Sequence, residues 1–257
     1  MSRRVDAVMD QLLQRRSLRR WTQFAESAEA SDPAALRQLR GRARALKRQI
    51  DRVLHVAEGR LALPMVGSNA MRKPATADWS WRPDVWRGPL PVPGMASVEN
   101  KTEIGPGTTV FHDCKVSELT FRQVRNQREA DLAPFGLRMD VFRFDGSFLS
   151  LAVDLPIQAV EGLKLKHLIR LDTIVETEKP LEIFARLNVK HGPNVEQIVR
   201  ELPLGEAEVM VEFDLAYTRM NEKRVERMWV DLIFEGPQMN QITLRDVTFC
   251  RRPRAEL

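Results

Sequence analysis

Apolar and polar residues alternate with a period of two along the C-terminal part of the chain, which is typical of half-buried β-strands. In residues 181–190 the odd positions are all aliphatic and the even positions are mostly polar. The same alternation recurs in residues 209–217 and 228–235. Each of these segments therefore has one face that enters a core and one face that carries polar groups.

The rest of the chain after residue 108 has the same character. The turn dipeptide Asp145-Gly146 predicts a hairpin between its flanking strands, because a tight primed turn needs positive φ. Residues 195–201 are expected to form a short helix or an irregular crossover. About nine strands with short turns, and no alternating helices, predict a mainly β fold: an antiparallel β-sandwich, jelly-roll-like. The expected strands are 109–112, 119–124, 137–144, 148–155, 167–176, 181–190, 209–217, 228–235 and 241–251.

The N-terminal part of the chain has helical periodicity instead. Residues 3–29 place apolar side chains at the i, i+3, i+4 and i+7 spacing of an amphipathic helix. Ser31-Asp32-Pro33 then indicates a helix end followed by a new helix, with Ser31 or Asp32 as N-cap and Pro33 at the first helical position. A second helix is predicted over residues 33–60. Residues 1–61 are thus expected to form an α-helical hairpin or arm.

This arm carries the positive charge of the protein. Residues 1–61 contain fourteen Arg or Lys and seven Asp or Glu, a net charge of +7, whereas the whole chain has +5. Residues 62–257 therefore carry −2. A basic helix has two interpretations: a solvated face or intermolecular coiled coil, or a contact with an anionic surface, either membrane or nucleic acid. The possible partners of residues 3–60 are accordingly a protein or such a surface.

Residues 62–107 are rich in proline, yet Trp79, Trp81 and Trp86 lie among the prolines. Because a solvated linker would leave these large apolar rings in water, we expect residues 62–107 to form a belt, of which residues 78–90 pack on the sandwich domain, residues 108–257. The alternative is a ligand platform, in which Trp79 and Trp81 stack on sugar rings or cations.

The sequence gives little support for catalysis, metal binding or membrane insertion. The four histidines are scattered, no nucleophile or phosphate-loop motif is present, and no metal or cofactor is expected. Two of the strand carboxylates, Asp140, Asp154, Asp214 and Asp231, could oppose each other as in a glycosidase, but their ordinary role is to pair with Arg143, Arg170, Arg186 and Arg245. Without an apolar run of about 18 residues or a signal peptide, we expect no transmembrane segment and a cytoplasmic location.

The polar face of the predicted sheet is the best candidate for a binding site. Amide and guanidinium groups match vicinal hydroxyls, and an indole offers a flat plate to a sugar ring. The alternative is a charge ladder on a solvated face, with the indole covered by another segment. The primary candidates are Arg186, Asn188, Asp214, Trp229 and Asp231. The secondary candidates are Asn194 and Asn240 in connecting loops, together with Trp79 and Trp81.

Three segments carry a resemblance to known proteins: ARLNVKHGPN (185–194), WVDLIFEGPQMN (229–240) and RRPRAEL (251–257). They resemble a family of uncharacterised proteins from Rhodobacter-type alphaproteobacteria, which implies a bacterial origin and brings no catalytic residues. In outline the sheet region is also similar to β-sandwich modules that bind carbohydrate. Two hypotheses follow: a non-catalytic module that binds a glycan or other polar ligand, or an assembly protein whose basic arm docks on a partner.

Overall fold

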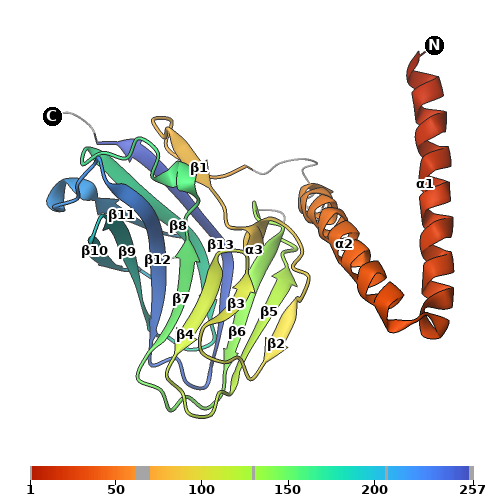
Figure 1. Cartoon of the computed structure of the whole chain (residues 1–257). Coiled ribbons are helices and arrows are strands. Elements are labelled where there is room, and N and C mark those ends of the chain that lie inside the picture. The colour runs from red at the N-terminus through yellow and green to blue at the C-terminus, as the bar shows by residue number, and fades with distance from the viewer. Residues whose placement is uncertain (1, 62–69, 129–130, 206–207, 255–257) are drawn as a thin grey trace. The chain divides into compact units, whose positions relative to one another are not determined.

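The computed structural model describes residues 2–61, 70–128, 131–205 and 208–254 (Figure 1). The chain divides into two compact units, Met1–Arg52 and Val53–Leu257. Pro64, in the predicted belt, lies outside the described residues. The predicted limits of the arm, the belt and the sandwich, at residues 61 and 107, stay predictions. Within the described ranges, none of the helices combines the length and apolarity needed to cross a bilayer.

The first unit is helical, as its periodicity predicts. Helix α1 (Ser2–Ser27) is followed by the short 3₁₀ helix η1 (Ala28–Ala30) and by α2 (Pro33–Leu61), whose last turns belong to the second unit. The Asp32 carboxylate accepts hydrogen bonds from the backbone N–H groups of Ala34, at 2.8 Å, and Ala35, at 3.1 Å. Asp32 is therefore the N-cap and Pro33 the first helical residue, as expected.

The second unit is an antiparallel β-sandwich, which confirms the predicted fold class: mainly β, jelly-roll-like, and preceded in the chain by α-helices. Its first sheet has the strand order β11-β8-β13-β6-β5-β2, with β1 also paired to β13, and its second sheet has the order β10-β9-β12-β7-β4-β3 (Figure 1). The first sheet contains β1 (Trp79–Trp81), β2 (Gly94–Ala96), β5 (Leu119–Arg125), β6 (Phe135–Val141), β8 (His167–Thr177), β11 (Glu208–Asp214) and β13 (Asn240–Pro253). The second contains β3 (Thr102–Gly105), β4 (Thr108–His112), β7 (Leu149–Asp154), β9 (Glu182–His191), β10 (Asn194–Glu201) and β12 (Val225–Glu235). Short helices α3 (Asp84–Arg87), η2 (Ile157–Ala159) and η3 (Leu215–Tyr217) lie between strands.

A single apolar core lies between the two sheets. In the second sheet, β9 contributes its odd positions, for example Leu187, and β12 its even positions, for example Val230. In the first sheet, β8 contributes Leu171 and β13 contributes Phe249. All four side chains are buried. Because the side chains of a strand alternate between faces, the polar residues of β9 and β12 lie on the outer face of the second sheet.

The predicted hairpin at Asp145-Gly146 is wrong. Strand β6 pairs with β5 and β13 in the first sheet, whereas β7 pairs with β4 and β12 in the second, so the connection crosses between sheets. Its polar groups bond to the segment after β4: the Asp113 carboxylate accepts hydrogen bonds from Ser147 N (2.7 Å) and Ser147 Oγ (2.6 Å). The Ser147 hydroxyl bond lowers the pKa of Asp113 below its ordinary value.

Residues 195–201 form a strand and not the expected short helix or crossover. Strand β10 pairs with β9 along its whole length, from Asn194 opposite His191 to Glu201 opposite Phe184. The turn between them contains only Gly192 and Pro193, and Gly192 adopts a φ of 58°. Gly192 makes the tight turn possible, because a residue without Cβ adopts positive φ at no steric cost.

The belt packs on a β-bulge in the central strand β13. The pairing of β13 with β8 shifts between Leu244 and Asp246, so Arg245 is the extra residue. Pairing of β13 with β6 ends at Leu244, and pairing with β1 begins at Phe249. Between these points the backbone of β13 has no strand partner on this side.

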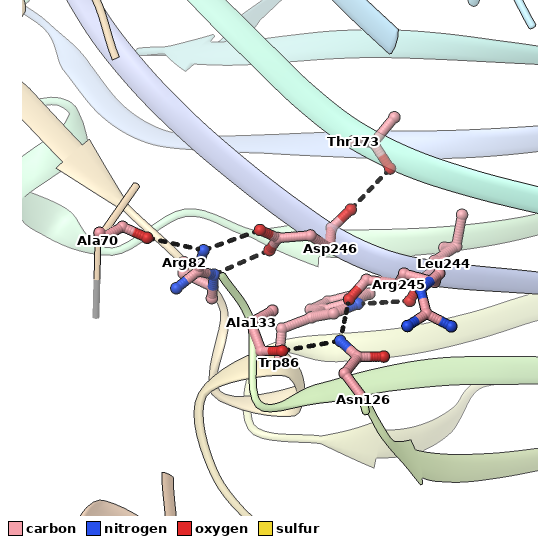
Figure 2. A network of polar contacts seen from close by, with 9 residues as sticks. All are labelled: Ala70, Arg82, Trp86, Asn126, Ala133, Thr173, Leu244, Arg245 and Asp246. Atoms are coloured by element: carbon pink, nitrogen blue, oxygen red, sulfur yellow. Dashed lines mark hydrogen bonds and ion pairs between the residues drawn. The ribbon is translucent and has the colours of Figure 1, made fainter. Parts of the chain in front are cut away.

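Side chains satisfy three successive carbonyls at the bulge (Figure 2). Trp86 Nε1 donates to Leu244 O, Asn126 Nδ2 donates to Arg245 O and Thr173 Oγ1 donates to Asp246 O, each at 2.8 Å. Trp86 is completely buried, and Trp81 stacks on Phe249 with ring centroids 6.1 Å apart. The tryptophans of the belt thus pack on the sandwich.

A buried ion pair joins the belt to the same bulge. Arg82 Nε and Nη2 donate to the two carboxylate oxygens of Asp246, each at 2.8 Å, and Nη2 also donates to Ala70 O (Figure 2). The Arg82 side chain is only 2% exposed. Burial raises the pKa of Asp246 above its ordinary value, although Arg82 acts in the opposite direction. The carboxylate therefore depends on Arg82 to offset its desolvation.

Replacing Arg82 with methionine is expected to destabilise the sandwich by about 3–5 kcal/mol, because it leaves the Asp246 charge buried without a partner. Urea unfolding followed by tryptophan fluorescence measures this loss. The matched control is Arg122→Met, which removes the half-exposed partner of Asp140 and should cost about 1 kcal/mol or less. Equal losses for the two variants would contradict the role given to Arg82.

The end of α2 packs on the belt within the second unit. A Cβ at Gly59 would overlap the Arg87 carbonyl oxygen, and a Cβ at Gly88 would overlap the His55 backbone, so both glycines allow close approach. His55 Nε2 lies 3.8 Å from the Asp84 carboxylate. Asp84 raises the pKa of His55 above its ordinary value, while burial and Arg87 lower it by less.

This contact should weaken as pH rises. Since the folded-state pKa of His55 is raised, its stabilising charge is fully present below the unfolded value of 6.5 and is lost as pH rises through the folded value. Hydrogen exchange, corrected for its intrinsic pH dependence, should show lower protection of residues 57–61 at the higher pH. Asp84→Asn should remove this pH dependence, and its persistence in that variant would rule out the pair as its cause.

Candidate functional site

The outer face of the second sheet carries a groove whose residues are aligned by strand register. Gln197, Asn188, Trp229 and Asp154 lie opposite one another in a row across β10, β9, β12 and β7. The next row on this face contains Arg186, Asp231, Ala152 and Thr109, and the third contains Ile233, Ser150 and Phe111.

Small side chains on β7 create the hollow. Ala152 and Ser150 form a low floor between Trp229 on one side and Phe111 on the other. The groove has a volume of about 550 Å³, which is within the range of ligand-binding sites. Its lining is Thr109, Phe111, Phe148, Ser150, Ala152, Asp154, Arg186, Asn188, Gln197, Arg227, Trp229, Asp231 and Ile233.

A hydrogen-bond network fixes the polar side of the groove. The Asp231 carboxylate accepts from Arg186 Nε at 3.0 Å, Arg186 Nη2 at 2.9 Å and Asn188 Nδ2 at 2.9 Å. Asn188 Oδ1 accepts from Gln197 Nε2 at 2.8 Å, and Asn188 itself is completely buried. Because each member orients the next, the accessible edges of Arg186 and Gln197 are held in place before any ligand arrives.

Arg227 covers part of Trp229. Its guanidinium carbon lies 4.7 Å from the centroid of the indole, and its Nη2 donates to Asp154 Oδ1 at 2.9 Å. The Arg227 side chain is 57% exposed and the Asp154 side chain is 50% exposed. This ion pair therefore contributes little to stability and is easily broken. The groove therefore has two arginines and two aspartates in pairs, and no net charge.

Aromatic rings lie at two separated places in the groove, Trp229 in its middle strand β12 and Phe111 at its β4 edge. Phe111 is two strands away from Trp229 and four residues further along, which corresponds to a separation of roughly 16 Å from strand spacing and rise. Phe148, which also lines the groove, is 42% exposed. A ligand that touches both Trp229 and Phe111 must be an extended chain and not a single small ring.

A second hollow, of about 230 Å³, lies on the outer face of the first sheet. It contains no aromatic side chain, and its charged groups bind one another: Arg170 with Asp172, Arg72 with Glu208, and Asp246 with Arg82. The first groove is therefore the better candidate for a ligand.

Four of the five primary candidates, Arg186, Asn188, Trp229 and Asp231, line the groove. Asp214 does not share their face, because β11 belongs to the first sheet. There Asp214 accepts a hydrogen bond from Ala216 N at 3.0 Å and lies 3.4 Å from Arg254, so it caps η3. The alternation predicts the outward orientation of Asp214 but carries no information about sheet membership.

The secondary candidates lie elsewhere. Asn194 is an exposed residue next to the β9–β10 turn, and Asn240 is buried, where its amide bonds Lys179 N at 3.0 Å and Lys179 O at 2.9 Å. Trp79 and Trp81 pair with β13 in the first sheet and pack against the core. None of these four contributes to the groove.

The strand carboxylates are partners of arginines, although mostly not of the arginines expected. Asp140 binds Arg122 and Arg138, Asp154 binds Arg227, and Asp231 binds Arg186 as expected. Among the described residues no cluster of three or more His, Cys, Asp or Glu could hold a metal ion.

Periodicity does not identify several groove residues, among them Phe111, Gln197 and Arg227. The sequence does predict that Ser150 and Ala152 face outward, because they alternate with Leu149, Leu151 and Val153, the buried apolar positions of β7. Residues 195–201 are predicted to be a short helix or a crossover and not a strand, so periodicity does not place Gln197 on the sheet. Phe111 lies on β4, whose place beside β7 only the sheet topology reveals.

These features define a β-sandwich with a pre-organised groove on its second sheet. The sequence model of a family of unknown function, DUF6478, matches residues 1–257, and the chain belongs to this family. No curated protein matches the chain. The expected alphaproteobacterial origin stays a prediction.

Several solved structures are similar to part of the chain. The enzymatically active domain of tailspike protein 4 from Bacteriophage CBA120 has a TM-score of 0.40 and 9% identity, over 60% of this chain and 21% of that one. The family 11 carbohydrate-binding module of Clostridium thermocellum, in complex with a mixed-linked tetrasaccharide, has a TM-score of 0.36 and 10% identity, over 63% and 97%. A xylan-binding domain from Paenibacillus barcinonensis has a TM-score of 0.34 and 9% identity, over 63% and 94%. At these TM-scores the likeness carries no argument about what this chain binds.

Replacing Asp231 with alanine is expected to cost about 1–3 kcal/mol of unfolding free energy, because Arg186 and Asn188 lose their common acceptor. Urea unfolding measures the loss. The control is Glu226→Ala, which breaks the half-exposed pair with Lys190 and should cost about 1 kcal/mol or less. A loss for Asp231→Ala no larger than that of the control would show that the network is not a structural unit.

Proposed function

We propose that the protein is a non-catalytic binding module whose groove on the second sheet holds a neutral carbohydrate chain. The observation that carries the proposal is the combination of two separated aromatic sites, Trp229 and Phe111, with fixed amide and guanidinium groups in one groove. These polar groups belong to β9 and β10, on the side of Trp229 away from Phe111. Aromatic faces pack on the apolar faces of sugar rings, while amide and guanidinium donors match their hydroxyls.

The paired charges of the groove residues favour an uncharged ligand. Arg186 and Arg227 are each bound to a carboxylate of the groove, so neither is a free cation for a uronate or sulfate group. An acidic glycan would also bring its charge close to Asp154 and Asp231, which repel it. Neutral hydroxyls instead accept from the outer edges of the guanidinium groups without breaking the pairs.

An extended ligand follows from the distance between Trp229 and the two phenylalanines. A monosaccharide reaches only one of these aromatic sites, whereas an oligosaccharide contacts both and gains additional burial. Stacking on Trp229 displaces Arg227 from the indole, at the small cost of an exposed ion pair.

The test is a glycan-array screen of the full chain, followed by calorimetry with the neutral oligosaccharides that bind. Trp229→Ala should weaken binding at least tenfold, since a central aromatic contact typically contributes more than 1.4 kcal/mol. The matched control is Tyr217→Ala, which removes an aromatic residue that is 79% exposed and outside the groove. Its affinity should equal that of the unmodified chain.

Two further measurements sharpen the test. Affinity for the neutral oligosaccharide should increase with chain length and change little with ionic strength, because no net charge is neutralised. Absence of neutral glycan binding, or equal affinity of Trp229→Ala and the unmodified chain, would refute the proposal.

A further inference from the structure

Helix α2 has an apolar band that is half-buried in its first part, at Leu36, Leu39 and Ala43, and exposed from Leu46 to Leu54. Written as heptads from Leu36, the a and d positions as far as residue 57 hold Leu36, Leu39, Ala43, Leu46, Ile50, Val53 and Ala57, and the adjoining e positions hold Leu54 and Leu61. Arg60 occupies the last d position. Leu46 is 39% exposed, Ile50 47%, Val53 67% and Leu54 45%. A band of this width on a helix normally packs against another apolar surface.

The contact of α2 with the belt uses the opposite side of the helix. His55 and Gly59, which approach residues 87–89, occupy the f and c positions. The belt therefore does not cover the a and d positions, and Val53 and Leu54 stay exposed in the same unit.

Basic residues border the band on both sides. Arg40 and Lys47 occupy e positions, and Arg42 occupies a g position, so cations flank the apolar residues along the first part of α2. Lys47 also pairs with Asp51 at 2.7 Å, and this pair on the helix surface is easily broken. The helix contains eight Arg or Lys and two acidic residues, Asp51 and Glu58. An apolar band with cationic borders is the pattern of a helix that lies in the surface of an anionic bilayer.

We propose that α2 docks the protein on a membrane surface that contains anionic phospholipid. The apolar band enters the boundary between headgroups and acyl chains, and Arg40, Arg42 and Lys47 contact the lipid phosphates and carboxylates. This inference is independent of the carbohydrate groove, because no groove residue takes part.

A second copy of the chain fits this face less well. In a parallel coiled coil the g residue of one helix meets the e residue of the next heptad in its partner, which would place Arg42 beside Lys47. In an antiparallel pair the e positions meet, which would bring Arg40 and Lys47 together. Both arrangements place like charges opposite each other, whereas anionic lipid neutralises them.

Nucleic acid also fits less well. Its phosphates would satisfy the basic borders, but the apolar band would stay in water, since the backbone of a duplex offers no matching apolar surface. Helix α2 contains no Phe, Trp or Tyr on which unpaired bases could stack. The band is the feature that distinguishes a lipid surface from a phosphate polymer.

The test is flotation of the full chain with vesicles of phosphatidylcholine alone or mixed with phosphatidylserine. The chain should float with the mixed vesicles only, and binding should weaken as salt rises. Arg40→Gln/Arg42→Gln should reduce partitioning about thirtyfold, at about 1 kcal/mol for each basic residue near the surface. Arg37→Gln/Arg48→Gln removes the same charge from the b and f positions and should reduce it less.

Ile50→Asn tests the band itself, with circular dichroism to confirm that the helix persists, and should also weaken flotation. Trp229→Ala should float like the unmodified chain, which separates this inference from the groove. Flotation with neither vesicle, or equally with both, would overturn the proposal. If vesicle binding is absent, a dimer that Ile50→Asn dissociates would also overturn the proposal. Salt-sensitive DNA binding that Ile50→Asn leaves unchanged would do the same.

Discussion

The β-bulge at Arg245 is the constraint on which the architecture of the second unit depends. It lies in β13, the strand that pairs with β8 from Ile242 to Pro253 and successively with β6 and β1 on the other side. A bulge interrupts the ladder and leaves carbonyl groups without strand partners, which is costly in a buried place. The belt supplies the missing donors through Trp86 and binds the Asp246 carboxylate through Arg82. The proline-rich segment is thus a structural part of the sandwich, and its conformation is fixed by the polar groups that it must satisfy.

The outer face of the second sheet combines polar side chains with a hollow. Alternation along β9 and β12 directs Arg186, Asn188 and Asp231 outward, and their mutual hydrogen bonds allow Asn188 to be completely buried at no unsatisfied cost. Strand β7 contributes Ser150 and Ala152 at the equivalent positions, so the face is low there. The groove is therefore a consequence of side-chain size on adjacent strands, and it needs no movement of the backbone to form.

Sequence periodicity predicts which side of a strand is buried, but it does not predict which strands are neighbours. The alternation in residues 181–190 correctly places Ile183 and Leu187 in the core and Arg186 on the surface. The same rule fails to bring Asp214 to the groove, because membership of the first or second sheet depends on contacts between distant segments. Asp145-Gly146 does not form the predicted hairpin for a related reason. The connection that contains it is held by hydrogen bonds from Ser147 to Asp113, more than thirty residues away. Phe111 and Gln197 required the complete strand order before they could be placed beside Trp229.

Charge is distributed so that the two proposed binding surfaces respond to different chemistry. The arm, residues 1–61, carries +7, and the rest of the chain carries −2, with the charges of the groove arranged in pairs. Attraction of an anionic membrane acts over the Debye length, about 8 Å at physiological ionic strength, and weakens as salt rises. Contacts between neutral hydroxyls and the groove act only at hydrogen-bond distance and are insensitive to salt. A chain that carried free cations in the groove would draw the same polyanions to both surfaces, and pairing Arg186 and Arg227 with aspartates removes that competition.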